Sequence, residues 1–196
     1  MPTPDLPLLT FPDASTLEAW FAAQPADCPG AWLRFAKAGA PEPTVSKSDA
    51  IDGALAHGWI DGQLGRVDEA YFKTRFTPRR PRSIWSQVNR ERVERLLAAG
   101  RMALAGLREV KAARADGRWE AAYPSARTAT PPDDLTAALA ERPEAQALWG
   151  ELDAANRYAV LHQVHNASAR ARPGVIARLA DALARGETPH PRRARR

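Results

Sequence analysis

The sequence contains a single cysteine, Cys28, and four lysines against 24 arginines. One cysteine excludes an internal disulfide framework and a multi-cysteine zinc site. No run of apolar residues approaches the length of about 18 that indicates a membrane-spanning helix. The first residues lack the basic and apolar regions of a secretory signal. We therefore expect a cytoplasmic protein without membrane insertion.

Signatures of common enzymes are also missing. The chain has no glycine-rich phosphate loop, no HExxH motif and no recognisable nucleophile elbow. His162 and His165 lie three residues apart on one face of a predicted helix, but a structural zinc site requires four ligands. We expect no metal and no cofactor. These absences favour a non-enzymatic protein, although His57, close to Asp61 in sequence, is a candidate general base.

Charge is unevenly distributed along the 196 residues. Residues 1–72 carry four basic and ten acidic side chains, whereas residues 73–95 carry eight basic and two acidic ones. The tail, residues 190–196, adds four arginines. Two interpretations remain open for the block of residues 73–95. It either neutralises the acidic first segment within the fold, or it forms a basic patch for phosphates or nucleic acid.

The hydrophobic pattern changes half-way along the chain. Ser15 and Ser46 each begin a capping-box sequence, which predicts a helix after each of them. Residues 31–37 and 71–76 alternate as strands do, and residues 59–61 predict a short strand paired antiparallel with residues 72–76. After Ser86 the spacing is helical, with a linker-like break at residues 126–132. The predicted helices end near Gly100, Gly117 and Gly186, with others at residues 133–142, 144–152 and 154–168.

This pattern predicts an α+β fold, with a small antiparallel sheet packed with helices in the N-terminal half and a helical C-terminal half. The expected organisation is an α+β module at residues 10–125, a helical module at residues 126–189 packed on it, and a disordered basic tail at residues 190–196.

Three short motifs supply candidate ligand-binding side chains. Asp61 lies between two glycines after Trp59. Pro78 and Pro81 stiffen an arginine-rich segment that leads to Trp85. Guanidinium groups favour bidentate contact with carboxylate or phosphate. The predicted strand at residues 71–76 adds Arg75, and the Asp-Gly-Arg-Trp-Glu motif at residues 116–120 adds two more residues. The full set of candidates is Trp59, Asp61, Arg75, Arg79, Arg80, Arg82, Trp85, Arg118 and Trp119.

Each candidate also has a structural interpretation. Asp61 is expected to cap its turn or to pair with Arg75, and the tryptophans are expected to pack in the core. The loop arginines either pair with the acidic first segment or bind an anion, and the flanking prolines predict that Arg79 and Arg80 lie at the surface. Arg118 and Glu120 form a candidate surface pair. Clustering of the candidates around one pocket favours a ligand or catalysis, and dispersal favours an interaction protein.

Several uncommon motifs occur in a fixed order: residues 58–61, 76–83, 85–86, 100–102, 105–107, 116–120, 156–159 and 185–188. Together they resemble the YdeI/OmpD-associated family, also called the bacteriocin-protection or OmdA-type family, across about residues 10–190. The resemblance implies a bacterial stress-related role in resistance to antimicrobial peptides. It implies no defined reaction, substrate or catalytic residue.

Three functions follow from these observations. The first is a non-enzymatic cytoplasmic binding or stress protein whose partner is a protein or an anionic small molecule. The second is binding of an anionic ligand or nucleic acid through residues 73–95. The third is an enzyme with a pocket around His57, Asp61 and the arginines.

Overall fold

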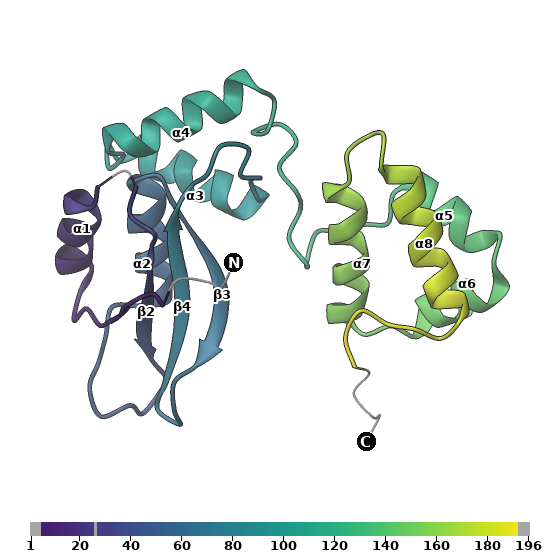
Figure 1. The fold of residues 1–196 in the computed structure, drawn as a ribbon, viewed down its shortest axis with the longest axis horizontal. Helices are drawn as coiled ribbons and strands as arrows, with labels where there is room; N and C mark the ends of the chain where they lie inside the picture. The colour runs from purple at the N-terminus through teal and green to yellow at the C-terminus, as the bar shows by residue number, and fades with distance from the viewer. Residues whose placement is uncertain (1–4, 26, 192–196) are drawn as a thin grey trace. The chain divides into compact units, whose positions relative to one another are not determined.

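The computed structural model describes residues 5–25 and 27–191. The chain divides into two compact units, Met1–Ala122 and Tyr123–Arg196 (Figure 1). The described part of the first unit holds four strands and four helices, and that of the second holds four helices. This confirms the predicted α+β fold. None of the helices within the described ranges is long and apolar enough to span a membrane.

The sheet of the first unit has the strand order β1-β2-β4-β3. Its strands are β1 (Leu8–Leu9), β2 (Ala31–Ala36), β3 (Trp59–Arg66) and β4 (Tyr71–Pro78). Strands β3 and β4 form the predicted antiparallel hairpin, with Asp61 opposite Phe76. Strand β4 also pairs antiparallel with β2, but β1 pairs parallel with β2. The sheet is therefore mixed rather than purely antiparallel. Strand β1 was not predicted, because two leucines are too few to show a strand pattern.

The two outer edges of the sheet are irregular. Strand β1 is two residues long, and the backbone N–H of Ala36, near the end of β2, donates instead to the hydroxyl of Thr44 at 2.9 Å. On the opposite edge, a register shift interrupts β3 between Asp61 and Leu64. Neither edge presents a long, regular row of backbone groups.

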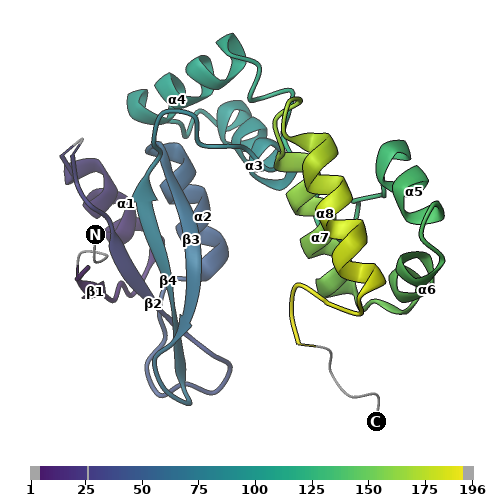
Figure 2. The same ribbon diagram turned by 45° about the vertical axis from the view of Figure 1, so that its right-hand side comes forward.

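Helices α1 (Ala14–Ala23) and α2 (Lys47–Ala56) lie on the same side of the sheet (Figure 2). Ser46 caps α2 as predicted and accepts from the backbone N–H of Asp49 at 3.1 Å. The cap of α1 is Asp13 rather than Ser15. The Asp13 carboxylate accepts from the backbone N–H of Thr16 and from the Ser15 hydroxyl, each at 2.8 Å, so the helix begins before Ser15.

The core of the first unit consists of two clusters that meet at α2. One lies between the sheet and the helices and includes Leu17, Phe21, Leu33, Phe35 and Phe76. The other joins Leu55 of α2 to Trp85, Trp119 and the helices α3 (Gln87–Ala98) and α4 (Leu104–Ala115). Helix α2 thus connects the sheet to the helical end of the unit.

Helix α4 crosses the C-terminal end of α2 at very short range. A Cβ atom added to Gly106 would lie 2.8 Å from the carbonyl oxygen of Leu55 and would also clash with the carbonyl of Ala56. The backbone N–H of Ala103 donates to that same carbonyl of Ala56 at 3.1 Å. The absence of a side chain at position 106 therefore fixes how closely the two helices pack.

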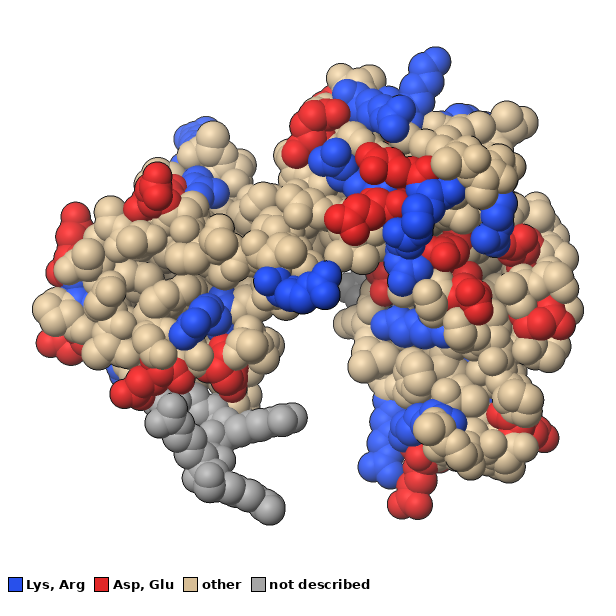
Figure 3. Space-filling view, turned by 180° about the vertical axis from the view of Figure 1, so that it is seen from behind, with Lys and Arg blue, Asp and Glu red and all other residues tan. Residues whose placement is uncertain are grey.

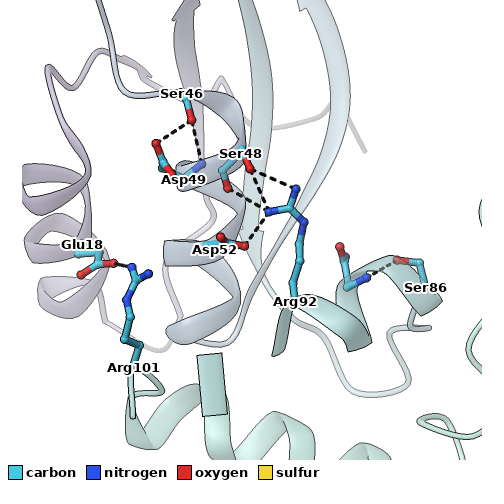
Figure 4. A network of polar contacts seen from close by, with 9 residues as sticks. Glu18, Ser46, Ser48, Asp49, Asp52, Ser86, Arg92 and Arg101 are labelled. Carbon is cyan, nitrogen blue, oxygen red and sulfur yellow. Dashed lines mark hydrogen bonds and ion pairs between the residues drawn. The ribbon is translucent and has the colours of Figure 1, made fainter. Parts of the chain in front are cut away.

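Two ion pairs join the acidic beginning of the chain to later basic residues (Figure 4). Arg92 of α3 donates to Asp52 of α2 at 2.6 Å, and its guanidinium also reaches Ser48. Arg101 donates to Glu18 of α1 at 2.6 Å. Arg92, which lies within residues 73–95, thus pairs with the acidic first segment, as one of the two interpretations of that block required, whereas Arg101 lies outside the block.

The second unit is built from α5 (Asp133–Ala140), α6 (Pro143–Glu151), α7 (Ala154–Asn166) and α8 (Arg172–Ala184), close to the predicted bounds. Arg172 pairs with Asp134 at 2.6 Å and joins α8 to α5. The buried Asn156 accepts from the backbone N–H of His190 at 2.8 Å and holds the end of the described chain. Of the predicted disordered tail, residues 192–196 lie outside the described residues.

Candidate functional site

The first unit contains a half-open cavity of about 560 Å³. We call it the His57 hollow. It lies where α1, α2 and β4 end and where β3 and α4 begin. The side chains that matter most to its chemistry are those of Phe21, His57, Trp59, Arg79, Arg108 and Glu109.

The turn at Gly58 brings these elements together. Gly58 follows α2 with φ +79°, which lets the chain reverse from the helix into β3. A Cβ atom on Gly58 would lie 3.1 Å from the carbonyl oxygen of Ala105 and 3.3 Å from the Cγ of Glu109. The backbone N–H of Arg79 donates to the Gly58 carbonyl at 2.9 Å. Helix α4 and the end of β4 are thereby both fixed against this turn.

Aromatic rings line the base of the hollow. Trp59 is 4% exposed, and its ring centroid lies 5.2 Å from that of Phe21 and 5.4 Å from that of Trp20. Phe21 in turn stacks on the His57 imidazole, with the centroids 6.2 Å apart and the ring planes 18° from parallel. Phe21 and Trp59 are 3% and 4% exposed, so only small parts of these rings are open to the hollow as apolar contact.

His57 is a half-buried titratable group of the hollow. Burial lowers its pKa from the ordinary value of 6.5, and the carboxylate of Glu18 opposes that shift. The imidazole is therefore neutral at pH 7, so the permanent charges of the hollow come from Arg79, Arg108 and Glu109. Arg108 is exposed, whereas Glu109 is half-buried.

Arg79 is a buried structural arginine, and its predicted surface position was wrong. It is 6% exposed, its guanidinium lies 3.4 Å from the centroid of the Trp85 ring, and it donates to the carbonyl of Ile84 at 3.3 Å. The flanking prolines predicted an exposed loop. Stacking on a buried tryptophan instead draws the aliphatic stem and the planar head of Arg79 into the protein.

The remaining loop and tryptophan candidates do not join the hollow. Arg80 and Arg82 are exposed and form no ion pair within the described residues. Trp85 and Trp119 pack against each other in the core, with their ring centroids 5.0 Å apart. Arg118 bonds to Asp116, not to Glu120 as predicted, and also donates to the carbonyl of Ser83 at 2.8 Å.

Asp61 and Arg75 lie on opposite faces of the sheet, so they do not pair as predicted. Asp61 is opposite Phe76, on the face covered by helices, and contacts Lys47 at 3.9 Å. Arg75 is opposite Trp32 on the other face. Asp61 therefore does not support His57 in the hollow. Of the nine candidate residues, Trp59 and Arg79 line the hollow and the others do not.

The basic block of residues 73–95 does not form one surface. Its side chains divide between the sheet, the core around Trp85 and the ion pair of Arg92. On the face that Figure 3 draws, Lys and Arg are intermixed with Asp and Glu. The run of basic residues at 73–95 in the sequence therefore does not produce one basic surface patch.

In the second unit, His162 and His165 both contact the ring of Tyr123, at 4.8 Å and 6.4 Å between ring centroids. Burial, followed by the nearby His165, lowers the pKa of His162. Among the described residues, no group of three or more His, Cys, Asp and Glu side chains is placed to hold a metal ion.

Sequence reasoning missed Phe21, Arg108 and Glu109 as residues of the hollow. Phe21 lies in a helical stretch without a functional motif, and no motif surrounds the two charged residues of α4. The available signal was Gly106, because a glycine inside a helical pattern often marks close packing against a neighbour. That contact brings α4 to the hollow.

Comparison with known families divides the chain into two segments. Residues 9–109, just over half of the chain, match the family described as a domain of unknown function, DUF8412. The chain belongs to this family. In this DUF8412 protein, residues 128–186 also match the family described as Bacteriocin-protection, YdeI or OmpD-Associated, which confirms the expected resemblance over that segment. The motifs between residues 58 and 86 lie in the first match. No curated protein and no solved structure matches the chain.

Proposed function

We propose that this is a non-enzymatic binding protein of the bacteriocin-protection type, working in the bacterial cytoplasm, and that its His57 hollow takes a small anionic ligand with a planar apolar part. The match at residues 128–186 supports the protective role. The observation that carries the ligand is the hollow itself, in which arginine side chains stand beside an aromatic base.

The size and lining of the hollow suit such a ligand. Small-molecule sites are typically clefts of about 300–1,000 Å³ with apolar walls and a few polar groups. Trp59 and Phe21 would contact the planar part. The exposed guanidinium of Arg108 would bind a carboxylate or phosphate group, while Glu109 would disfavour ligands of higher negative charge.

Binding is favoured over covalent catalysis by the residue types present. The described residues that line the hollow include no serine, threonine or cysteine. His57 therefore has no hydroxyl or thiol nucleophile there to activate. Its role in this proposal is to add positive charge below its lowered pKa, so affinity for an anion should rise as the pH falls.

Calorimetric titration tests the proposal with three probes: benzoate, indole-3-acetate and inorganic phosphate. We expect an aromatic carboxylate to bind, and Arg108→Gln to raise its Kd roughly tenfold, because a hydrogen bond to a charged group is lost. Glu109→Gln should lower the Kd, since it removes the opposing charge. Arg80→Gln, outside the hollow, is the matched control. Failure of all three probes, or equal effects of Arg108→Gln and Arg80→Gln, would contradict the proposal.

A further inference from the structure

The face of the sheet opposite α1 and α2 carries its own set of aromatic and basic side chains. Strand register places Trp32 opposite Arg75, Arg34 opposite Lys73 and Ala36 opposite Tyr71. These residues alternate with Leu33 and Phe35, which face the helices. The outer sheet face therefore consists of Trp32, Arg34, Tyr71, Lys73 and Arg75.

Aromatic rings and cations are paired on this face. The Arg34 guanidinium lies over the Tyr71 ring, 3.6 Å from its centroid, and the Lys73 ammonium lies 4.7 Å from the centroid of the Trp32 ring. Tyr71 is buried beneath Arg34, whereas Trp32 is half-exposed. Neither ring belongs to a core cluster of the described residues. The face thus offers two planar platforms, an indole and a guanidinium backed by a phenol ring.

Positive charge dominates the outer sheet face. Arg34, Lys73 and Arg75 contribute three cations, and the Glu42 carboxylate, whose side chain is 80% exposed, contacts Arg34 at 3.8 Å. The Nε atoms of Arg34 and Arg75 are buried and have no hydrogen-bond partner among the described residues. Buried donors without partners are rare in folded proteins, because each one carries a desolvation cost. An anionic ligand would complement the charge of this face.

We propose that the outer sheet face binds single-stranded nucleic acid. Unpaired bases stack on aromatic rings and on arginine planes, while basic side chains track the backbone phosphates. Alternate residues of a strand are about 6.6 Å apart, so platforms and cations repeat along β2 and β4 at short intervals. A duplex keeps its bases stacked internally and would use the cations but not the indole. This inference is independent of the ligand proposed for the His57 hollow.

The first experiment compares charge at two places in the full chain. Fluorescence anisotropy is measured with a labelled 12-nucleotide oligo(U), with a duplex DNA of equal length and heparin as competitors. Lys73→Gln with Arg75→Gln and Arg80→Gln with Arg82→Gln each remove two positive charges. We expect the Lys73 and Arg75 substitutions to raise the Kd for oligo(U) about tenfold. The Arg80 and Arg82 substitutions should leave it within about twofold, because only Lys73 and Arg75 lie on the outer sheet face. Equal losses, or tighter binding of the duplex, would overturn the proposal.

The second experiment tests stacking without a change of charge. Trp32→Thr keeps a strand-forming residue and should raise the Kd at least fivefold, because a base stacked on an aromatic ring contributes about 1–3 kcal/mol. Trp32→Phe keeps a ring and should restore most of the affinity. Far-ultraviolet circular dichroism checks that both variants fold. Wild-type affinity in Trp32→Thr, or no binding of oligo(U) by the native chain, would reject the face as a nucleic-acid site. If Trp32→Thr does not fold, an unchanged Kd in the Lys73 and Arg75 pair rejects it equally.

Discussion

A buried guanidinium at the end of β4 is stacked on a tryptophan ring. Arg79 stacks on Trp85 and bonds to the carbonyl of Ile84, while its own backbone N–H bonds to Gly58. It therefore connects the base of the His57 hollow to the cluster around Trp85. Its neighbours Arg80 and Arg82 have the same charge but are exposed.

The contrast between Arg79 and Arg80 is measurable. Arg79→Ala should lower the free energy of unfolding by about 2 kcal/mol, because it removes a desolvated cation–π contact and leaves a carbonyl group without its donor. Arg80→Ala should change it by no more than about 0.5 kcal/mol. Urea denaturation of the purified variants gives both values. Equal midpoints for the two variants would show that Arg79 contributes no more than a surface residue.

The two histidines with lowered pKa values predict how stability depends on pH. Burial lowers the pKa of His57 and of His162 below the ordinary value of 6.5. As the pH falls, the unfolded chain is therefore protonated at these positions at a higher pH than the folded chain. The free energy of unfolding should therefore fall as the pH drops below about 6.5. Three carboxylates whose pKa values lie below 3.8 remain ionised at pH 5 and do not contribute to this change: Asp13, Asp116 and Asp134.

Denaturant melts at pH 7.5 and pH 5.0 test this dependence. The wild-type protein should be less stable at pH 5.0, and His57→Gln and His162→Gln should each reduce the difference between the two pH values. Replacement of both should reduce it further. A difference that is unchanged in the double variant would assign the acid sensitivity to other groups.

At the scale of secondary-structure elements, the crossing of α4 over α2 depends on a single position, Gly106. Gly106→Ala should destabilise the protein by about 1–3 kcal/mol, because the new Cβ atom meets backbone that cannot move without displacing a helix. Gly150 of α6 has nothing within 4 Å of an added Cβ atom, which makes Gly150→Ala the matched control. It should be neutral or stabilising by up to about 1 kcal/mol. Thermal melts followed by circular dichroism distinguish the two changes.

Local periodicity was sufficient to predict most elements. The alternation of residues 31–37 and 71–76, and the cap at Ser46, depend on neighbours within one turn or one strand, and the structure confirms them. The cap at Asp13 was missed because a carboxylate two residues earlier competed with the predicted Ser15. Strand β1 was missed because its pairing partner lies more than 20 residues away.

The candidate site was harder to predict because packing between distant segments assembles it. Arg108 and Glu109 reach the hollow through the contact of Gly106 with α2. Asp61 and Arg75 looked adjacent across the hairpin, but neighbouring register positions alternate between faces, so one turns to the helices and the other away. Burial of Arg79 required Trp85, which no local pattern connects to it.

At the scale of the whole chain, each unit has a core of its own. The twelve buried residues of the helical core all lie between Leu135 and Leu183. We expect residues 1–122 and residues 123–196, produced separately, to fold and to melt cooperatively. Their circular dichroism spectra should add up to that of the whole chain. A fragment that stays unfolded would show that its core is insufficient alone.

The irregular edges of the sheet have a consequence for self-association. A strand with a free, regular edge can pair with another copy of the chain and so nucleate aggregates. Here β1 occupies part of the β2 edge, Thr44 satisfies Ala36, and the register shift interrupts β3. Together these features protect the sheet against growth by strand addition. Loss of β1 would leave Trp32 and Leu33 on an open edge, so a chain shortened to begin at Phe11 should scatter more light on storage than the full chain.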